Sequence, residues 1–403
     1  MRCADAGVVI VGGGQAGSRA AEALRLAEFR GSITLVGDEV HLPYERPQLS
    51  KELLLKEEAG PAYIRSREQW QELDVDVMTG VRVAGCDLER RVLGFEDGRE
   101  RPFTKLLIAT GTRARRLPDL EQGPIPVFYL RSVDDAVGLR ASLREGLRVA
   151  LIGGGVIGLE VAAAAVERGC AVTVIEAAPL VLAQVGSRLI SEYFLKLHRD
   201  LGVRVLTEVT AQRVAPEGLV LSDGSICPAD LVLVGIGVEP AVESVAGSGI
   251  STSKGIRVDR HGATECDGVY AAGDVAEQWN RCADRWMRVE NWANAQNQAV
   301  STAKSMLGQG EGYDSVPWFW SDQHKTNLQV VGSLSNVTEI VRGDSSCGRF
   351  SVLGLRDDEI VGAATVNAPK HMAILRRAVA ARMRVNRADL ENPEFDLKRL
   401  LSK

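Results

Sequence analysis

The same strand–turn–helix pattern occurs twice in this chain, and it constrains the fold more than any other feature. Residues 7–17 read GVVIVGGGQAG, and residues 149–158 read VALIGGGVIG. Each segment begins with a short apolar run typical of a buried parallel strand and continues through glycines into a helical pattern. A second strand follows each helix and ends on an acid, Asp38 in the first copy and Glu176 in the second. The pattern predicts two βαβ units of an α/β fold.

The glycine spacing in both copies is Gly-x-Gly-x-x-Gly, and each glycine has a physical task. The first permits a tight turn, the second lets a pyrophosphate approach the backbone, and the third lets the helix pack closely on the strand. The helix N-terminus favours phosphate, and the acid accepts hydrogen bonds from ribose hydroxyls. One such motif is a weak indication, but two in full βαβ context predict two dinucleotide sites. The glycines are Gly12, Gly14, Gly17, Gly153, Gly155 and Gly158.

Two dinucleotide sites in one chain are typical of a protein that binds FAD and is visited by a nicotinamide nucleotide. Glu176 favours NADH over NADPH, because a carboxylate at this place repels a 2′-phosphate. Two further strand-to-turn segments fit a flavoprotein. They are residues 106–112, which include Thr110 and Gly111, and residues 269–274, which end in Gly273 and Asp274.

Composition sets the outer limits of the interpretation. The chain has 403 residues, enough for two or three domains at ~150 residues each. The formal net charge is 48 − 53 = −5, which argues against a nucleic-acid partner. The apolar run near the N-terminus is too short for a signal peptide or a membrane span, so we expect a cytoplasmic protein. The seven cysteines form neither a CxxC pair nor a cysteine–histidine cluster, so we expect reduced thiols and no metal site.

With these pieces in place, the chain resembles the FAD-dependent ferredoxin reductases of bacterial oxygenase systems, which have the glutathione-reductase-like fold. The resemblance covers essentially the whole chain. Its most specific segments are LPYERPQLSKELL (42–54), IATGTRAR (108–115), VYAAGDVAE (269–277), NWANAQNQA (291–299) and PWFWSDQ (317–323). It implies an α/β architecture with two Rossmann-like domains, in which an NAD domain is inserted into a FAD domain, followed by a C-terminal α+β domain. The implied boundaries are 1–110 with 240–312 for FAD, 111–239 for NAD and 313–403 for the C-terminal domain.

The resemblance also implies roles for individual residues. Those implied for FAD are Gly12, Gly14, Ala16, Gly17, Asp38, Arg46, Lys51, Val83, Thr110, Gly111, Arg131, Gly273, Asp274 and Trp292. Those implied for NAD are Gly153, Gly155, Ile157, Gly158, Glu160 and Glu176.

Three of the implied residues belong to the reacting centre of the family. Lys51 and Glu160 are expected to pair beside the flavin, and Trp320 to form part of an aromatic wall that excludes water. Trp292 is expected to begin a helix whose positive N-terminus faces the pyrimidine edge of the flavin. Without the resemblance, Lys51 is interpreted as a solvated lysine, Glu160 as a first-turn acid and Trp320 as a core residue.

The cysteine positions bear on the reaction. Relatives on this fold that reduce disulfides or peroxides need a reactive cysteine near the flavin. The expected flavin loop, residues 38–58, contains no cysteine. Electrons are therefore expected to pass from NADH through FAD directly, and singly, to a [2Fe–2S] ferredoxin that feeds a terminal oxygenase. The alternatives are another acceptor, such as rubredoxin or a quinone, and a redox-sensing flavin-binding interaction protein.

Two features differ from, or add to, the family pattern. Leu180 and Gln184 stand where the family usually has arginines that bind NAD, which puts the affinity for NADH in doubt. Residues 370–388 contain six Lys or Arg and no acid. A helix over 371–385 would place Lys370, Arg377 and Arg384 on one face, where they would attract an acidic ferredoxin. The alternative is a solvated helix face.

Overall fold

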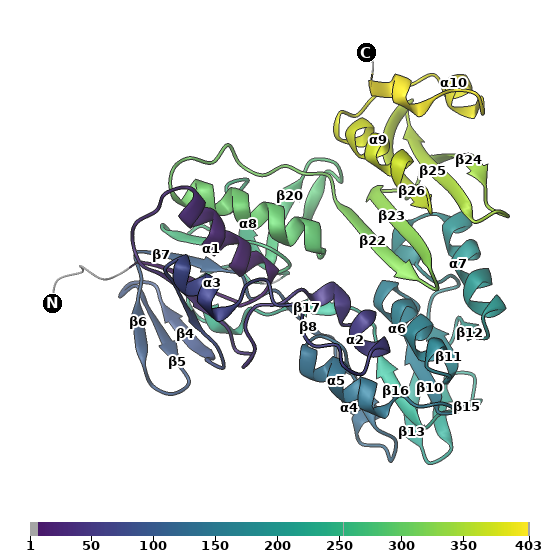
Figure 1. Cartoon of the computed structure of the whole chain (residues 1–403), viewed down its shortest axis with the longest axis horizontal. Helices are drawn as coiled ribbons and strands as arrows, with labels where there is room; N and C mark the ends of the chain where they lie inside the picture. The colour runs from purple at the N-terminus through teal and green to yellow at the C-terminus, as the bar shows by residue number, and fades with distance from the viewer. Residues whose placement is uncertain (1–6, 253, 402–403) are drawn as a thin grey trace. The chain divides into compact units, whose positions relative to one another are not determined.

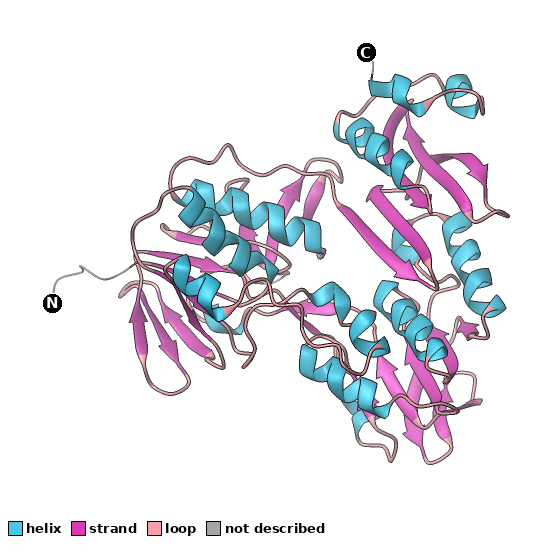
Figure 2. Cartoon of the chain, in the orientation of Figure 1, coloured by secondary structure: helices cyan, strands magenta, loops and turns pink. Residues whose placement is uncertain are grey.

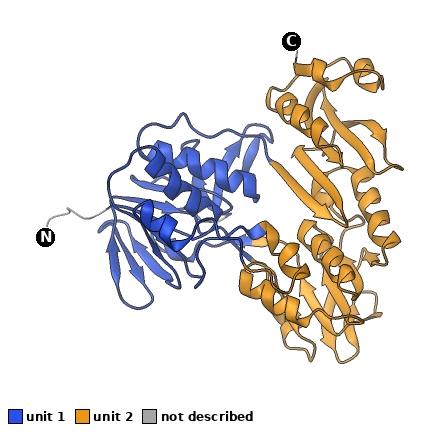
Figure 3. Cartoon of the chain, viewed as in Figure 1, with its two compact units in different colours: residues 1–46, 61–113, 239–317 blue, residues 47–60, 114–238, 318–403 orange. Residues whose placement is uncertain are grey.

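The structure, a computed structural model, describes residues 7–252 and 254–401. The chain forms two compact units (Figure 3). Unit 1 holds the described residues up to 46, together with 61–113 and 239–317. Unit 2 holds 47–60, 114–238 and the described residues from 318 onward. The sequence predicted three domains, and the segment 47–60, which it placed in the FAD domain, lies in unit 2. The boundaries of the three domains stay a prediction.

Unit 1, in which Figure 1 labels strand β7 and helices α1 and α8, is built on a five-stranded sheet. The strand order is β19-β7-β1-β2-β3. The central strand β1, Val8–Val11, runs parallel to β2, Ile33–Val36, and to β7, Lys105–Ile108. Helices α1, Gln15–Leu26, and α8, Trp292–Met306, pack against one another on one face of this sheet. Both helices turn small residues inward, mainly alanines, which lets the two backbones approach closely.

The other elements of unit 1 extend this core. They are α3 (Arg67–Glu72), β3 (Val75–Met78), β4 (Val83–Asp87), β5 (Val92–Phe95), β6 (Glu100–Pro102), η3 (Glu243–Val245), β18 (Ile256–Val258), β19 (Val269–Ala271), β20 (Ala276–Asn280) and β21 (Arg285–Arg288).

Unit 2 repeats the same architecture. Its parallel sheet has the order β12-β11-β10-β16-β9, with β10 (Arg148–Ile152) paired to β11 (Ala171–Glu176) and β16 (Leu231–Val234). Helix α6, Val156–Glu167, connects β10 to β11 and is buried along most of its length. The other elements are α2 (Glu52–Leu55), α4 (Pro118–Glu121), β9 (Val127–Phe128), α5 (Val133–Ser142), η2 (Ala183–Val185), α7 (Arg188–Asp200), β12 (Arg204–Thr207), β13 (Ala211–Ala215), β14 (Gly218–Leu221) and β15 (Ile226–Pro228). At the borders of the units lie η1 (Arg46–Gln48), β8 (Thr112–Ala114) and β17 (Val238–Pro240).

The C-terminal part of unit 2 is an antiparallel sheet with helices near the end of the chain (Figure 2). The strand order is β22-β23-β26-β25-β24, and the strands are β22 (Trp318–Gln323), β23 (Thr326–Gly332), β24 (Thr338–Asp344), β25 (Arg349–Arg356) and β26 (Glu359–Val366). Helix α9, Pro369–Ala380, buries Met372, Leu375 and Val379 against it. The short α10 (Arg387–Glu391) and η4 (Leu397–Leu401) follow.

The predicted fold class is confirmed, and the basic helix near the C-terminus is present, but the end predicted for it is wrong. The helix expected over 371–385 begins at Pro369 and ends at Ala380. Arg382 adopts a left-handed conformation with φ of +47°, and the Met383 N–H donates to the Ala378 carbonyl at 3.0 Å. This arrangement closes the helix as a glycine usually does, so Arg384 lies outside the helix.

Among residues 7–252 and 254–401, no helix combines the length and the apolar character needed to cross a membrane. The same part of the chain holds no group of three or more histidine, cysteine or acidic side chains placed to bind a metal ion.

Candidate functional site

The glycine turn of unit 1 forms a cradle at the carboxyl end of β1. Gly12 has a φ of +122°, and its N–H donates to the Val36 carbonyl at 2.7 Å, which ties the turn to β2. A Cβ on Gly12 would collide with the Ala109 backbone, and a Cβ on Gly17 would collide with the Gly12 carbonyl. A Cβ on Gly14 would instead point into open space and meet no described atom within 4 Å. The cradle is therefore open on the side of Gly14.

Helices α1 and α6 begin at the two glycine turns without help from a capping side chain. Their N-cap residues are Gly14 and Gly155, and their first turns consist of uncharged residues. Helices α3 and α5, by contrast, begin with the capping boxes of Ser66 and Ser132. An uncapped helix start presents N–H donors and a partial positive charge, which is the chemistry that binds a pyrophosphate. Both turns therefore fit a dinucleotide.

Five of the other residues implied for FAD gather at the edge of the sheet that carries the turn. Asp38 follows β2, Thr110 and Gly111 follow β7, and Gly273 and Asp274 follow β19. Because these strands are parallel, their carboxyl ends meet at one edge, where ligands of such sheets bind.

Arg46 forms the centre of a charged cluster beside this edge. Its guanidinium donates to Glu39 at 2.6 Å and to the Tyr44 hydroxyl at 3.0 Å. Burial opposes the positive charge, but Tyr44 and Glu39 outweigh it, and Asp274 adds to them, so the pKa of Arg46 is raised. Arg46 is therefore a fixed cation that interacts electrostatically with Asp274.

Trp292 begins helix α8, as expected. The side chain of the preceding Asn291 caps the helix by accepting from the Asn294 N–H at 2.8 Å. The Trp292 indole donates to the Glu45 carboxylate. One turn further along α8, Gln298 accepts from the Gly273 N–H at 2.9 Å, which fixes the turn that carries Asp274.

Three of the residues implied for FAD have other contacts in the structure. Val83 is buried in the apolar core that also contains Val11 and Ile108. The Thr110 hydroxyl donates to the Ala241 carbonyl at 2.6 Å and so fastens its own loop. Arg131 belongs to unit 2, where its backbone N–H donates to Asp135 at the start of α5.

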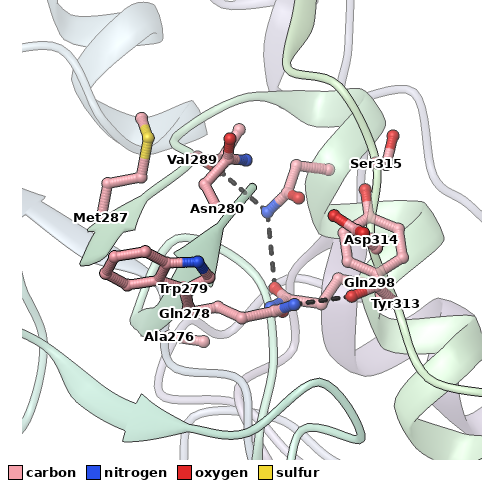
Figure 4. Close-up of a pocket in the computed structure, with 11 residues that line it drawn as sticks. Ala276, Gln278, Trp279, Asn280, Met287, Val289, Gln298, Tyr313, Asp314 and Ser315 are labelled. Atoms are coloured by element: carbon pink, nitrogen blue, oxygen red, sulfur yellow. Dashed lines mark hydrogen bonds between the residues drawn. The ribbon is translucent and has the colours of Figure 1, made fainter. Parts of the chain in front are cut away.

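Unit 1 contains a small pocket with Gln298 in its lining (Figure 4). It is lined by strands β20 and β21, by helix α8 and by residues 313–315. Gln298 donates to Gln278 at 2.8 Å, and Gln278 donates to the Tyr313 carbonyl at 2.6 Å. Since Gln298 also holds Gly273, the pocket residues support the turn that carries Asp274.

In unit 2, Glu176 closes the second glycine turn. One of its carboxylate oxygens accepts from the Gly154 N–H at 2.6 Å, and the other accepts from the Ala178 N–H at 2.7 Å. Each oxygen keeps capacity for a further donor, so the carboxylate can also accept from ribose hydroxyls. Ile157, in the first turn of α6, is exposed.

The two departures from the family pattern differ in position relative to this turn. The Gln184 side-chain nitrogen lies 3.7 Å from the position that a Cβ on Gly155 would take. Gln184 therefore reaches the open side of the turn, where it offers a neutral donor instead of a cation. Leu180 follows Glu176 by four residues and offers no donor.

We expect the Gln184→Arg variant to bind NADH more tightly, with a half-saturating concentration about 5- to 10-fold lower. Arginine adds a charge-assisted hydrogen bond to a pyrophosphate, which is worth ~1 kcal/mol more than a neutral one. The measurement is a titration of NADH against the rate of flavin bleaching. Leu180→Gln serves as a control that adds an amide without a charge, and an unchanged half-saturation in Gln184→Arg would contradict the placement of this side chain.

Lys51 and Glu160 lie together in unit 2, as anticipated from the sequence. The Lys51 ammonium is 2.9 Å from Glu160 Oε1, and the Glu160 side chain is almost completely buried. Ser321 donates to the same oxygen at 2.6 Å, and Ser50 donates to Oε2. The buried carboxylate thus accepts from three side chains that come from the 47–60 segment and from β22. Sequence reasoning missed both serines, because nothing in the spacing distinguishes them from other hydroxyls of the same motifs.

Two arginines hold the segment that carries Lys51. Arg140 of α5 donates to the carbonyls of Leu53, Lys56 and Ala59 at 2.9–3.2 Å. Arg168, which follows α6, donates to the Leu54 carbonyl at 3.0 Å and to Glu57. These contacts fix residues 53–59 to the nucleotide-binding part of unit 2 and so hold Lys51 next to Glu160.

The aromatic residues of β22 form a stack. The rings of Trp318 and Trp320 are 5.5 Å apart at an interplanar angle of 27°, and the Arg376 guanidinium lies 4.2 Å from the Trp318 ring. Of the basic residues expected on one helix face, Lys370 and Arg377 are exposed on α9. Arg384 lies beyond the helix and donates to the Asp357 carbonyl. The helix therefore offers a shorter basic face than predicted, with Arg376 turned to the tryptophans.

His198 of α7 is completely buried against the β22–β23 hairpin. Its Nε2 lies 2.9 Å from Gln323 Oε1, and its Nδ1 lies 3.2 Å from His324 Nε2. Burial lowers the pKa of His198 to about 4, the bond to Gln323 opposes the shift, and His324 adds to it. Burial also lowers the pKa of His324.

We expect His198 to make the protein less stable as the pH falls from about 6.5 to about 4. The unfolded histidine binds a proton near ~6.5, whereas the folded one binds it near 4, so acid favours the unfolded state in this window. One such group contributes a slope of ~1.4 kcal/mol per pH unit. Urea unfolding at a series of pH values should give a shallower slope for His198→Gln than for the wild type. Equal slopes would show that His198 is not the group that titrates.

Comparison with known proteins finds matches over almost the whole chain. A sequence model described as pyridine nucleotide-disulphide oxidoreductase matches residues 6–299, and one described as reductase C-terminal matches residues 318–401. The chain is 44% identical over 393 residues to the ferredoxin–NAD(+) reductase component of the p-cumate 2,3-dioxygenase system of Pseudomonas putida, covering 97% of each. It is 39% identical to the corresponding component of the anthranilate 1,2-dioxygenase system of Burkholderia cepacia, covering 98% of each. Among solved structures, the reductase in the covalent putidaredoxin reductase–putidaredoxin complex is similar over 99% of each chain, with a TM-score of 0.94 and 32% identity.

Proposed function

The chain belongs to the pyridine nucleotide-disulphide oxidoreductase family. We propose from its site that it is an NADH-dependent reductase that binds FAD as its cofactor and passes electrons one at a time to a [2Fe–2S] ferredoxin. The observation that carries the proposal is the pair of open glycine turns, one in each unit. Each turn begins an uncapped helix and is accompanied by an acid at a strand end, Asp38 in unit 1 and Glu176 in unit 2. Two such turns fit two dinucleotides.

FAD, when bound, supplies the redox chemistry, since it accepts two electrons as a hydride from NADH and releases them singly. The residues of the chain bind FAD and NADH and orient them. In unit 1 we assign the Gly12–Gly17 turn, Asp38 and Asp274 to FAD, with Arg46 as a nearby cation. In unit 2 we assign the Gly153–Gly158 turn to the NADH pyrophosphate and Glu176 to the ribose.

We assign Lys51 and Glu160 to the step in which the hydride is transferred. A buried carboxylate with three donors is rigid, and it holds the Lys51 ammonium in one place. A fixed cation next to a site of electron transfer favours the developing negative charge. Trp320, stacked on Trp318, is assigned to keep water from the reacting rings.

The thiols of the chain support transfer to an external carrier. None of the six cysteines among the described residues forms a disulfide. Burial raises the pKa of Cys86 to about 11, with Asp87 adding to the shift, and burial also raises the pKa of Cys170, Cys227 and Cys266. Such thiols are poor nucleophiles. An internal thiol relay is therefore disfavoured, and electrons pass from the flavin directly to the acceptor.

The acceptor is assigned as a ferredoxin that feeds a terminal oxygenase, in keeping with the names of the relatives. The exposed Lys370 and Arg377 of α9 suit an acidic carrier, because opposite charges steer transient electron-transfer partners together. We place this reaction in the cytoplasm and in the oxidation of an aromatic compound.

The proposal is tested by the stoichiometry of turnover. The purified holoprotein is mixed with NADH and a [2Fe–2S] ferredoxin under anaerobic conditions, and both partners are followed by absorbance. We expect two ferredoxins to be reduced for each NADH oxidised, with NADPH at least ~50-fold less effective. NADH oxidation that proceeds equally well without ferredoxin, or only with a quinone, would reject the ferredoxin assignment.

A further inference from the structure

A continuous line of hydrogen bonds connects Glu160 to a histidine pair at the end of β22, along the face of the strand that carries Ser321 and Gln323. Ser321 bonds to Glu160 at 2.6 Å, and Gln323 bonds to Ser321 at 2.9 Å. His198 of α7 lies 2.9 Å from Gln323, and His324 lies 3.2 Å from His198. Glu160, Ser321, Gln323 and His198 are all buried. The site as assigned above uses only the Glu160 end of this line.

The chemistry of each group fixes the direction of every bond in the line. A carboxylate only accepts, so Ser321 spends its one proton on Glu160 and must accept from Gln323. The Gln323 nitrogen therefore faces Ser321, and its oxygen faces His198. It follows that His198 carries its proton on Nε2 and accepts on Nδ1, so His324 donates to it. All bonds point toward Glu160.

His324 lies in a tight turn whose backbone conformation is unfavourable for a histidine. His324 and Lys325 connect β22 to β23, and both have positive φ, +48° and +64°. Two-residue turns of this kind favour asparagine and glycine, and other residues adopt the left-handed conformation at a cost. The turn nevertheless carries a histidine, and the ring of this histidine contacts His198.

The line is unsuited to carry protons. A proton that left Glu160 would have to pass through the Gln323 amide, whose nitrogen donates but does not accept. A chain with one fixed direction instead strengthens each of its bonds and rigidifies its end group. The physical role that remains is to hold the carboxylate in place.

We propose that Ser321, Gln323 and His198 are positioning residues for the reaction. They hold the Glu160 carboxylate in the one orientation in which it pairs with the Lys51 ammonium and keeps that ammonium in place. The proposal rests on the assignment of Lys51 and Glu160 to hydride transfer. It predicts that residues of α7 and β22 without contact to Lys51 control the rate of the chemical step but leave the binding of NADH unchanged.

The first test separates rate from binding in the holoprotein. The limiting rate of flavin bleaching and the half-saturating NADH concentration are measured for wild type, Ser321→Ala and Gln323→Leu. We expect the limiting rate to fall about 5- to 10-fold in both variants, with unchanged half-saturation, and to recover in Ser321→Thr. Ser351→Ala is the matched control, because Ser351 is a buried serine of the same sheet that lies 2.8 Å from His371 and has no contact with Glu160.

The second test reads the direction of the bonds without turnover. In protein labelled with ¹⁵N-histidine and kept free of NADH, the ring of His198 should be neutral and protonated on Nε2 alone. Glu160→Gln should allow both tautomers, because an amide at the end of the line no longer requires the Ser321 proton. His198→Gln identifies the resonances.

The outcomes distinguish this inference from the proposed function. A wild-type flavin that NADH fails to bleach rejects the proposed function and this inference together. Normal wild-type bleaching with limiting rates unchanged in both variants, a change in half-saturation alone, or His198 protonated on Nδ1, rejects only the inference. Slower reoxidation by ferredoxin with normal bleaching would indicate a proton path and also overturn it.

Discussion

The Gly14→Ala variant should fold normally but be purified almost without FAD. The backbone at Gly14 is extended, with φ of −93° and ψ of −165°, which alanine adopts without strain. The added methyl group points into the open side of the turn, where the pyrophosphate has to approach the backbone. We expect FAD affinity to fall at least ~100-fold, a loss of ~3 kcal/mol. The flavin content and a titration of the apoprotein with FAD measure it.

Gly155→Ala is the matched change in unit 2. Gly155 is also extended, with φ of −77° and ψ of −175°, and a Cβ there meets only the end of the Gln184 side chain within ordinary contact distance. This variant should keep its FAD and its colour, and lose NADH binding by a similar factor. A variant of Gly14 that retains FAD, or a variant of Gly155 that loses it, would contradict the assignment of the two turns.

Replacement of Lys51 by methionine is expected to slow the bleaching of the flavin by NADH about 30-fold. The change removes the only formal positive charge paired with Glu160 among the described ion pairs and leaves a buried carboxylate held by two serines. A charge-assisted contact of this kind is worth ~2 kcal/mol, which corresponds to about 30-fold in rate. The limiting rate at saturating NADH is the measurement.

Lys56→Met is the control for this substitution. Lys56 lies five residues further along the same segment and pairs with Glu52 on the surface, so its loss should leave the rate within a factor of two. The double variant Lys51→Met/Glu160→Gln should bleach at a limiting rate close to that of Lys51→Met alone. Its loss of rate should be smaller than the two single losses combined, because the pair acts as a unit. Equal limiting rates for Lys51→Met and Lys56→Met would contradict the assignment of Lys51 to hydride transfer.

The local parts of the fold were accessible from the sequence because short-range physics determines them. The apolar run before the first glycine turn predicted a buried strand, which is β1, Val8–Val11, and the strand predicted before Asp38 is β2, Ile33–Val36. The glycine spacing predicted the starts of α1 and α6. The end of α9 was missed, because Arg382 takes a left-handed conformation that the sequence would have signalled only with a glycine.

The parts of the site that depend on distant contacts were not accessible. Ser321 meets Glu160 across 161 positions of the sequence, and Arg168 meets Leu54 across 114. His198 and Gln323 have no pattern in the sequence that relates them. The pairing of Lys51 with Glu160 was anticipated only because family motifs contain both residues, and the groups that orient this pair emerged only with the fold.

The central claim is that NADH reduces a bound flavin, which then gives up its electrons singly. Anaerobic stopped-flow absorbance of the purified yellow protein tests it most directly, with NADH and NADPH in separate experiments and a [2Fe–2S] ferredoxin added afterwards. The account predicts that NADH bleaches the flavin much faster than NADPH does, and that ferredoxin restores the colour in two one-electron steps. A flavin that neither coenzyme bleaches at a useful rate would contradict the account and favour a redox-sensing flavin-binding interaction protein.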